Sequence, residues 1–442
     1  MIKIFKSNLN SEDRYILELF SFFSQTKIHY VDTLNIDVIY FSSEPEDNCI
    51  WLYNENAKID WDIYDPNESS FDIQKSNFLK ACAVLIYDKV NKESFENNSN
   101  LDKHNRLLYE NSFQHKAGYH AYPIVNCIFR IFSQFCNKKL NLKLGTYIPE
   151  GKKAIVVLSH DVDNPIKYPA IFSNPLKYGI VDSLKSHILY FLDPNKDDYF
   201  NFKIIRDIEN SYGFKSTFYF QSINRFTNIG NKHDVTYDIK TKKIRKEISD
   251  LINDGFEVGM HPSYKCFEKK ENYIFQKKEL ENITKKNVIS NRHHLWSMGI
   301  DKEESLIKIS ESGFLMDSSI AFNDHHGFRR SIALPYNPIL PDKNKKLLEI
   351  PVMLMDGNFF YKNHQIDDLK DIFKKQLDIL KLESGIGSLN WHDYTSVPRS
   401  DFYNWGLGYV TLLEILHNDK EVLVMSNSEF NLYIKSLDVN IF

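Results

Sequence analysis

The stretch Ala154–Pro165, AIVVLSHDVDNP, decides the fold of this chain. Its first five residues, 154–158, are apolar and largely β-branched, which is typical of a buried strand. Asp161 and Asp163 follow two positions apart, so in extended backbone both side chains leave the same face. Paired carboxylates repel each other unless a cation or a shared proton lies between them. The alternative is a polar strand end that forms Asx turns and is closed by Pro165.

Length and composition indicate a globular protein of two domains. The chain has 442 residues, too many for one ordinary core, and 42% of them are hydrophobic. Its net charge of −4 gives no electrostatic attraction for nucleic acid or anionic membranes. The most apolar long stretch, Tyr122–Cys136, contains polar residues and is too short to span a bilayer. We therefore expect no nucleic-acid partner and no transmembrane segment.

Cysteine usage indicates a reducing compartment. The chain has five cysteines and no CxxC pair: Cys49, Cys82, Cys127, Cys136 and Cys266. An odd number without regular spacing is typical of free thiols. The N-terminal sequence, MIKIFKSNLNSEDRY, has no apolar core of signal-peptide length. We expect a soluble, cytoplasmic protein.

Residues 1–150 are expected to form a separate, smaller α/β domain. Glu12–Phe23 has helical spacing of apolar residues, and Phe78–Tyr87 is apolar enough for a core helix or strand. Residues 89–117 are rich in Asn, Lys, Glu and Ser, which predicts a long loop or a poorly ordered insertion. Pro123–Phe135 is an amphipathic helix. No catalytic constellation occurs in this region, and its role is open between packing, substrate reach and assembly.

Residues 151–442 show strands that alternate with helices. Apolar strand-like runs lie at 154–158, 216–221, 256–260, 288–290, 314–317, 347–355, 386–391 and 422–425. Helical patterns lie between them, and Ser426 with Glu429 forms a capping box at the start of the last helix. This alternation predicts a parallel sheet of about seven strands, as in a (β/α) barrel. The long insertion 164–198 after the first strand is a candidate lid.

Polar side chains gather where these strands end. Beyond the two aspartates of the first strand, each of four later strands runs into its own polar residues: His261, Arg292–His294, Asp317 and His392. In a parallel barrel all these strand ends open on one face, so the residues converge. Each residue alone has an ordinary structural explanation, such as a hydrogen-bonded histidine or a turn-forming aspartate. Their joint occurrence at five strand ends predicts an active site.

The collected residue types match the needs of metal-assisted hydrolysis. One aspartate and two histidines are a familiar ligand set that leaves positions open for water and substrate. Such a metal polarises a carbonyl group and lowers the pKa of its water, while a nearby carboxylate accepts the proton. A further histidine can protonate the leaving group. The combination predicts a hydrolase of amide or ester bonds.

Five short motifs carry a family resemblance. They are HDVDNP at 160–165, GMHPSY at 259–264, RHHLW at 292–296, MDSS at 316–319 and NWHDY at 390–394. Their order resembles that of the polysaccharide deacetylases (carbohydrate esterase family 4). The chain is most similar to the branch with an SHDVD first motif and an added N-terminal domain, found in bacterial surface-polysaccharide loci. The resemblance covers residues 150–430 and is weaker in the N-terminal region, where AYPIVN at 121–126 is the most suggestive match.

The resemblance implies a fold, a metal and a set of roles. The fold is α/β, a distorted (β/α)7 barrel preceded by the smaller N-terminal domain, and the activity is removal of N-acetyl groups from sugars. By position, Asp161 would be the general base, Asp163 the metal-binding carboxylate and His261 the first metal histidine. His392 would be the general acid. Arg292 would orient the base through a charge-assisted hydrogen bond.

Two departures from the family pattern affect these roles. A valine separates aspartates that are adjacent in the family, so the roles of Asp161 and Asp163 are open to exchange. Lys265 occupies the position of the second motif histidine and cannot ligate a metal while protonated. We expect His294 to be the replacement ligand, with His293 as the alternative. Lys265 is expected to face solvent or a carboxylate, because its charge would repel a divalent cation.

The resulting prediction is a metal-dependent deacetylase acting on an N-acetylated sugar in a lipid-linked or nucleotide-linked precursor of a surface glycan. Zinc is the first choice of metal, with cobalt, nickel or manganese as alternatives. The rival prediction is a catalytically inactive barrel that serves as a glycan-binding or assembly protein, since the second motif histidine is missing. A third is a hydrolase of a non-sugar amide. The aromatic-rich segments 168–200 and 402–405 favour a sugar, because rings stack on pyranose faces.

Overall fold

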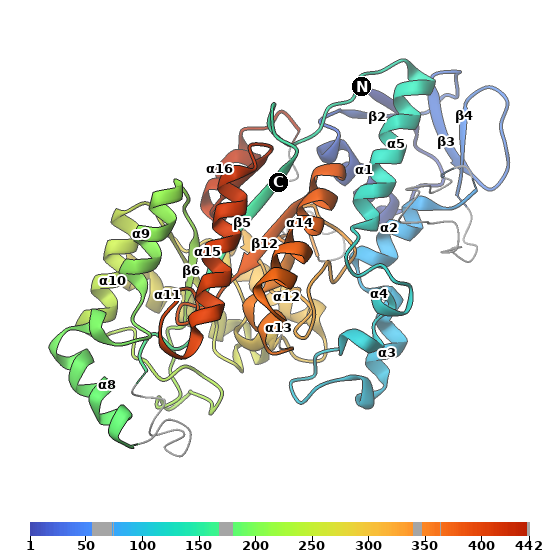
Figure 1. The fold of residues 1–442 in the computed structure, drawn as a ribbon. Helices are drawn as coiled ribbons and strands as arrows, with labels where there is room; N and C mark the ends of the chain where they lie inside the picture. Colours follow the sequence, from blue (N-terminus) through green and yellow to red (C-terminus); the bar gives the residue numbers. More distant parts are fainter. Residues whose placement is uncertain (55–72, 74, 168–179, 339–346, 363, 440–442) are drawn as a thin grey trace.

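The protein contains two parallel β-sheets, one in each part of the chain. The computed structural model describes residues 1–442 apart from 55–72, 74, 168–179, 339–346, 363 and 440–442. Figure 1 shows the N-terminal elements, coloured blue to teal, on one side of the larger sheet, and α8 (Ile180–Leu192) projecting on the other. This arrangement confirms the expected α/β fold with a smaller N-terminal unit.

The smaller sheet has the strand order β2-β1-β3-β4, and all its pairings are parallel. Its strands are β1 (Ile2–Phe5), β2 (Ile28–Val31), β3 (Val38–Ser42) and β4 (Ile50–Tyr53). Three helices share its buried apolar core: α1 (Ser11–Phe23), α2 (Phe78–Ile86) and α5 (Ile124–Leu140). The stretch that was open between helix and strand is thus the helix α2. α1 begins at a capping box in which Asn10 and Asp13 exchange hydrogen bonds.

The polar segment 89–117 is a chain of short helical turns, which corrects the expectation of a long loop. These turns are η2 (Lys89–Asn91), α3 (Lys92–Glu96), η3 (Asn98–Asn100), η4 (Tyr109–Asn111) and α4 (Phe113–Lys116). Buried Asn91 explains part of this order, because its side chain donates to Asp88 and Gln114 and accepts from the Phe113 amide. The polar residues satisfy the backbone of the turns instead of remaining solvated.

The larger sheet is a distorted parallel barrel, as expected. Its strands are β5 (Ala154–Val162), β6 (Thr217–Phe220), β7 (Glu257–Met260), β8 (Ser290–Asn291), β9 (Met316–Asp317), β10 (Leu348–Glu349), β11 (Val352–Met355), β12 (Ile386–Asn390) and β13 (Val422–Met425). The order runs β10-β9-β8-β7-β6-β5-β12-β11, with β13 on β5. Only residues 350–351 separate β10 from β11, so one interrupted strand supplies both ends of the sheet. Counting it once, and leaving aside β13, which pairs with β5 off this path, gives the seven strand positions of a (β/α)7 barrel.

Helices surround this barrel. Its strands are all parallel, so their carboxyl ends lie on one side. They are α9 (Phe202–Tyr212), α10 (Lys242–Asn253), α11 (Lys270–Thr284), α12 (Lys302–Glu311), α13 (Asp356–Phe360), α14 (Ile366–Leu382), α15 (Tyr403–Asn418) and α16 (Asn427–Lys435). Short turns are η5 (Pro194–Lys196), η6 (Cys266–Glu268), η7 (His294–Trp296) and η8 (Ser400–Phe402). β5 is buried at every position. The capping box of Ser426 and Glu429 is confirmed.

The N-terminal sheet and the barrel share one buried apolar cluster. It extends from β1 and α5 to β5 residues such as Ile155 and Val157. A bidentate ion pair adds to this contact, since Arg130 of α5 donates to both oxygens of Glu383 at 2.9 and 3.0 Å. The predicted boundary between residues 150 and 151 falls in the connection from α5 to β5. Of the predicted lid, α8 is described and residues 168–179 lie outside the described part of the chain.

Candidate active site

Strand β5 presents its polar residues on two sides, as alternation requires. Ser159 and Asp161 face the barrel interior, where both contact Arg292. His160 faces the other way: its ring hydrogen-bonds the Trp391 carbonyl at 2.8 Å and the Glu209 carboxylate at 2.7 Å. The imidazole of the first motif therefore serves the packing around the strand. The aspartates are left to face the site.

Asp163, His261 and His294 bring three ligand atoms together. Asp163 Oδ1 lies 3.3 Å from His261 Nε2 and 3.2 Å from His294 Nδ1. The two nitrogens are 3.0 Å apart. Ligands on a tetrahedral metal with bonds of about 2.0–2.1 Å are separated by about 3.3 Å, so this spacing suits a single divalent ion.

The hydrogen bonds behind the two rings fix their tautomers. His261 Nδ1–H donates to the Arg292 carbonyl at 2.5 Å, and His294 Nε2–H donates to the His233 carbonyl at 2.8 Å. In neutral rings the other nitrogens carry lone pairs, and these are the nitrogens that face Asp163 Oδ1. That oxygen is buried, and none of the described residues donates a hydrogen bond to it. Three acceptors in mutual contact require a positive charge among them, so the residues fit a metal cation.

A proton can occupy this place when no metal does. Burial opposes protonation of His294, but the Asp163 carboxylate outweighs burial and raises the pKa of His294. Protonation and metal binding therefore compete for the same lone pairs. The site is built to hold positive charge in either state.

Asp161 is held as a carboxylate by a buried arginine. Arg292 Nη1 donates to Asp161 Oδ1 at 3.2 Å, and Asn390 Nδ2 donates to Oδ2 at 2.7 Å. Burial opposes ionisation, yet the positive charges of His261, Arg292 and His392 outweigh it and lower the pKa of Asp161. Asp161 is thus charged and oriented, with one lone pair on each oxygen still free of protein donors.

Arg292 has every one of its N–H donors satisfied. The guanidinium carries five N–H groups. Besides Asp161, these donate to the hydroxyls of Ser159, Ser318 and Ser388 and to the Ser318 carbonyl, at 2.7–3.2 Å. The side chain is fully buried and lies over the Tyr219 ring at 4.5 Å. This complete enclosure makes Arg292 a rigid positive support for Asp161.

His392 forms a second charged pair, with a residue that the sequence analysis missed. His392 Nδ1 hydrogen-bonds Asp356 Oδ1 at 2.8 Å, and the His392 amide donates to Asp356 Oδ2 at 2.9 Å. Burial opposes protonation, but the charges of Asp356, Asp163 and Asp161 outweigh it and raise the pKa of His392 to about 10. His392 Nε2 lies 3.6 Å from Asp163 Oδ2, on the side of the ligand set. Asp356 begins α13 directly after β11, so the strand-end rule was the signal that could have found it.

The other histidine and lysine candidates lie apart from the ligand atoms. His293 packs between Tyr273 and Phe267, with ring centroids at 5.9 and 6.3 Å, and both ring nitrogens are buried without a hydrogen-bond partner among the described residues. Lys265 Nζ pairs with Glu268 Oε1 at 3.2 Å, and its side chain is 57% exposed. Lys265 therefore faces solvent and a carboxylate, as the sequence analysis expected. The structure brings His294 to the ligand set and turns His293 away from it.

Two further strand-end aspartates have structural contacts. Asp317 accepts hydrogen bonds from Asn291 and Ser319. Asp393 Oδ1 accepts from the Asp163 amide at 3.2 Å, which fixes the backbone that carries the ligand carboxylate. Burial and the nearby charge of Asp163 raise the pKa of Asp393. Asp393 thus supports the backbone beside the charged set.

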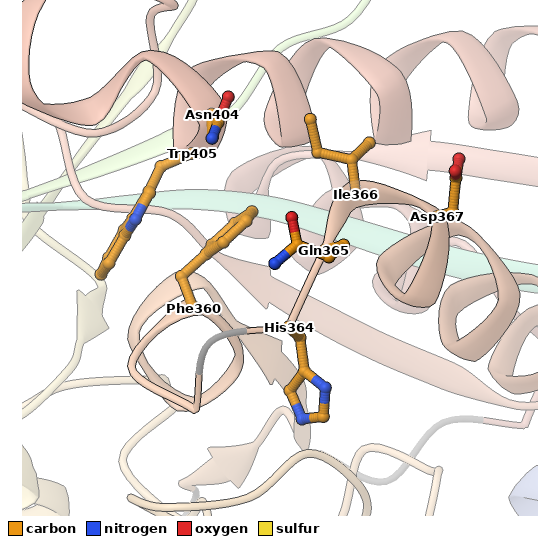
Figure 2. Close-up of a pocket in the computed structure, with 7 residues that line it drawn as sticks. All are labelled: Phe360, His364, Gln365, Ile366, Asp367, Asn404 and Trp405. Atoms are coloured by element: carbon orange, nitrogen blue, oxygen red, sulfur yellow. The ribbon is translucent and has the colours of Figure 1, made fainter.

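Aromatic rings connect His392 to a cavity at the rim of the barrel. Ring centroids lie 5.7 Å apart for His392 and Tyr394, 5.1 Å for Tyr394 and Phe402, and 5.2 Å for Phe402 and Trp405. Trp405 stacks on Phe360 at 5.1 Å, and both line a cavity of about 390 Å³ (Figure 2). The remaining lining residues are His364, Gln365, Ile366, Asp367 and Asn404. The cavity thus combines two aromatic faces with polar groups.

Comparisons with known proteins give matches among solved structures. No family profile and no curated protein matches the chain. A structure described as a polysaccharide deacetylase from Mycobacterium smegmatis matches with a TM-score of 0.46 and 15% identity, over 65% of this chain and 92% of that one. Another so described, from Pseudomonas aeruginosa PAO1, has a TM-score of 0.46 and 10% identity over 67% and 95%. A CE4 family pseudoenzyme from Bacillus anthracis has a TM-score of 0.32 and 11% identity over 63% and 65%.

These structures carry the name of the superfamily that the five motifs of this chain resemble. In the described part of the chain, no helix is both long enough and apolar enough to cross a membrane.

Proposed function

We propose that this protein is a metal-dependent hydrolase that removes an N-acetyl group from a sugar. The observation that carries the proposal is the meeting of Asp163, His261 and His294 at 3.0–3.3 Å, with lone pairs directed at one another. Two charged pairs, Asp161 with Arg292 and His392 with Asp356, flank that set. A ligand set with an acid and a base beside it is what amide hydrolysis requires.

Each residue has a role in the proposed reaction. Asp163, His261 and His294 would hold the metal, which when bound polarises the acetyl carbonyl and makes water more acidic. Asp161 accepts a proton from the attacking water, while Arg292 keeps the carboxylate ionised and oriented. The water oxygen bonds to the acetyl carbon and the C–N bond breaks.

The leaving amine receives its proton from a different group. His392 donates from Nε2, and Asp356 on Nδ1 keeps the ring in the tautomer and orientation for that transfer. The products are acetate and a free amino sugar. The lysine at position 265 is compatible with this reaction, because His294 occupies the third ligand place.

Two observations support a sugar precursor as the substrate. The cavity in Figure 2 is lined by the Trp405 ring, which is stacked on buried Phe360, and by Gln365 and Asn404 as hydrogen-bonding groups, and this combination suits a sugar ring. All five cysteines are free thiols, as in a reducing compartment. We therefore place the reaction in the cytoplasm, on a lipid-linked or nucleotide-linked precursor of a surface glycan, with zinc as the first metal to test.

The test combines metal content with acetate release. Untagged protein should contain a zinc ion that is lost in His261→Ala, and it should release acetate from nucleotide-linked or lipid-linked N-acetylhexosamines. Asp161→Asn should lower turnover about 10²–10⁴-fold with folding intact, because a general base contributes that much. Asp238→Asn, which changes an exposed turn carboxylate, is the matched control and should be fully active.

Three outcomes would contradict parts of this proposal. Full activity of Asp161→Asn would show that the general base is Asp163 or another residue. Zinc retained in His261→Ala, in the site of Asp163 and His294, would remove His261 from the ligands. A protein without metal at this site that still binds the glycan would be the inactive, glycan-binding barrel.

A further inference from the structure

A second cluster of histidines lies outside the candidate active site. His120, in the connection from α4 to α5, meets His325 and His326, in the connection from β9 to β10. One ligand nitrogen of each ring lies within 4.8 Å of the others. All three residues are half-buried. Because the cluster combines segments from the two parts of the chain, it is a contact between the N-terminal region and the barrel.

Backbone contacts fix the place of His120 beside the other two. The Phe328 amide donates to the His120 carbonyl at 2.8 Å, and the Gly327 amide donates to the Met353 carbonyl of β11 at 2.8 Å. Gly327 has a φ of +110°, and a Cβ there would lie 2.1 Å from the His120 oxygen. Only glycine allows this approach, so the loop that carries two histidines is tied directly to the third.

The side chains offer lone pairs for a ligand. His325 Nδ1–H donates to the His326 carbonyl at 2.8 Å, which leaves His325 Nε2 as an acceptor. His120 Nδ1 is buried and has no hydrogen-bond partner in the part of the chain that the structure describes. Tyr109 stacks on His325 with ring centroids 3.8 Å apart and covers one side of the cluster. An oriented ring and a buried nitrogen without a partner are features of a ligand site.

The chemistry of the donor set selects the class of ligand. Three imidazoles without a carboxylate suit zinc, copper or nickel, whereas calcium and magnesium prefer oxygen ligands. Tetrahedral zinc separates its nitrogen ligands by about 3.3 Å, whereas these nitrogens lie within 4.8 Å of one another, so the rings must turn and draw together when a metal binds. The alternative is simple ring packing, since His325 and His326 also stack at 4.3 Å.

We propose that His120, His325 and His326 bind a second divalent transition metal, zinc in the first instance, that joins the N-terminal region to the barrel. Three protein ligands leave a fourth coordination position for water or substrate. The place is close to the active-site elements, because Asn358 of α13 donates to the His325 carbonyl at 2.7 Å and Asp356 begins the same helix. This proposal does not depend on the deacetylase activity.

The test is zinc stoichiometry and affinity, measured with zinc alone on untagged full-length protein. The wild type should bind two equivalents, and His325→Ala and His326→Ala should each bind one. His261→Ala should also bind one, and the double variant His261→Ala/His325→Ala should bind none. His115→Ala is the matched control: its exposed ring touches Tyr109 at 4.7 Å but is not part of the cluster, so it should bind two.

The outcomes separate this proposal from the proposed function. One equivalent that survives in His325→Ala and disappears in His261→Ala would overturn the second site and leave the first. One equivalent that survives in His261→Ala and disappears in His325→Ala would do the reverse. Thermal unfolding with and without zinc shows whether each variant folds, and zinc should raise the midpoint of His261→Ala but not of the double variant. Equal midpoints in those two variants would also overturn the second site.

Discussion

The two histidine clusters differ in what surrounds them. Asp163, His261 and His294 follow rigid parallel strands, and the ligand set includes a carboxylate. His120 and the pair at 325–326 lie in connections, and their set contains imidazoles only. Acid–base pairs flank the first cluster, whereas Tyr109 and a backbone contact flank the second. The proposed chemistry therefore belongs to the first cluster, because charged hydrogen-bonding pairs surround its ligand atoms and those of the second cluster are packed against rings.

The charges of the two clusters follow the same division. Near the first, carboxylates outweigh burial and raise the pKa of His392 to about 10. In the second, burial is the main cause that lowers the pKa of His120 and His325 to about 4 and that of His326 to about 3. The second cluster is thus neutral at pH 7. A neutral imidazole cluster can hold a metal but cannot deliver a proton to a leaving group at that pH.

We expect the largest effect, on the free energy of unfolding, from the ion pair between Asp88 and Arg329 next to the second cluster, which we call the clamp. Asp88 accepts two hydrogen bonds from Arg329, at 2.9 and 2.8 Å, and Arg329 follows shortly after His326. Asp88→Asn leaves a buried arginine without its counter-ion, so the free energy of unfolding at pH 7 should fall by about 3 kcal/mol. Asparagine keeps the left-handed backbone at this position, where φ is 56°. Denaturant unfolding measures the difference.

The sign of the pH dependence follows from Asp88. Burial opposes its ionisation, but Arg329 and Arg330 outweigh burial and lower the pKa of the folded state. The stabilisation is therefore complete above the unfolded pKa of about 3.9 and is lost as the pH falls through the lower folded pKa. The difference between wild type and Asp88→Asn should shrink below about pH 4. Asp37→Asn, which breaks an exposed pair, is the control and should cost less than about 1 kcal/mol at any pH. An equal loss of unfolding free energy in both variants would show that the Asp88–Arg329 pair contributes no more than an exposed ion pair.

The next effect should be confined to the first cluster. Asp356→Asn removes the charge that holds His392, so kcat should fall about 10–100-fold while KM stays nearly constant, as for other residues that orient an active-site histidine. Asp356→Glu should recover part of the loss. The zinc content of the second cluster should not change, although Asn358 of the same helix contacts it. A loss of zinc from the second cluster, or a rise in KM alone, would show that Asp356 acts through the stability of α13.

The strand-end residues were accessible to sequence reasoning because two local rules place them. Alternation along an extended strand puts Asp161 and Asp163 on one face, and parallel topology brings His261, His294 and His392 to the same end. These rules need no knowledge of side-chain packing. The preference for His294 over His293 did not follow from these rules, and the structure turns His293 toward Tyr273. The chemical roles of these residues remain predictions.

The features that the sequence analysis missed depend on contacts between distant residues, which the spacing of residues along the sequence does not indicate. Asp356 followed a predicted strand, but only its contact with His392 distinguishes it from a helix-capping aspartate. The second cluster depends on Gly327, whose missing side chain lets two distant loops touch. Residues 89–117 were predicted to be solvated because their composition is polar. The hydrogen bonds that buried Asn91 makes with this segment form only in the folded protein, so composition does not indicate them. Tertiary contacts decide each of these cases.

The smallest effect is expected at Lys265, and it tests the difference between a ligand and a neighbour. The Lys265 side chain is 57% exposed and pairs with Glu268 at 3.2 Å, away from the ligand atoms. An exposed pair contributes little, so Lys265→Ala should change zinc affinity at the first cluster by less than about 0.5 kcal/mol. His294→Ala should weaken the same affinity strongly, because it removes a direct ligand.

Zinc titration of both variants should use a His325→Ala background, so that only the first cluster binds. Retained binding in Lys265→Ala with loss in His294→Ala would agree with the geometry of the site. The opposite result would mean that a neutral lysine takes the third ligand place when metal is present. His294 would then be, like His293, a residue that only supports the barrel. The first cluster would bind metal through a carboxylate, one imidazole and a lysine amine, and only the second cluster would be a set of histidines.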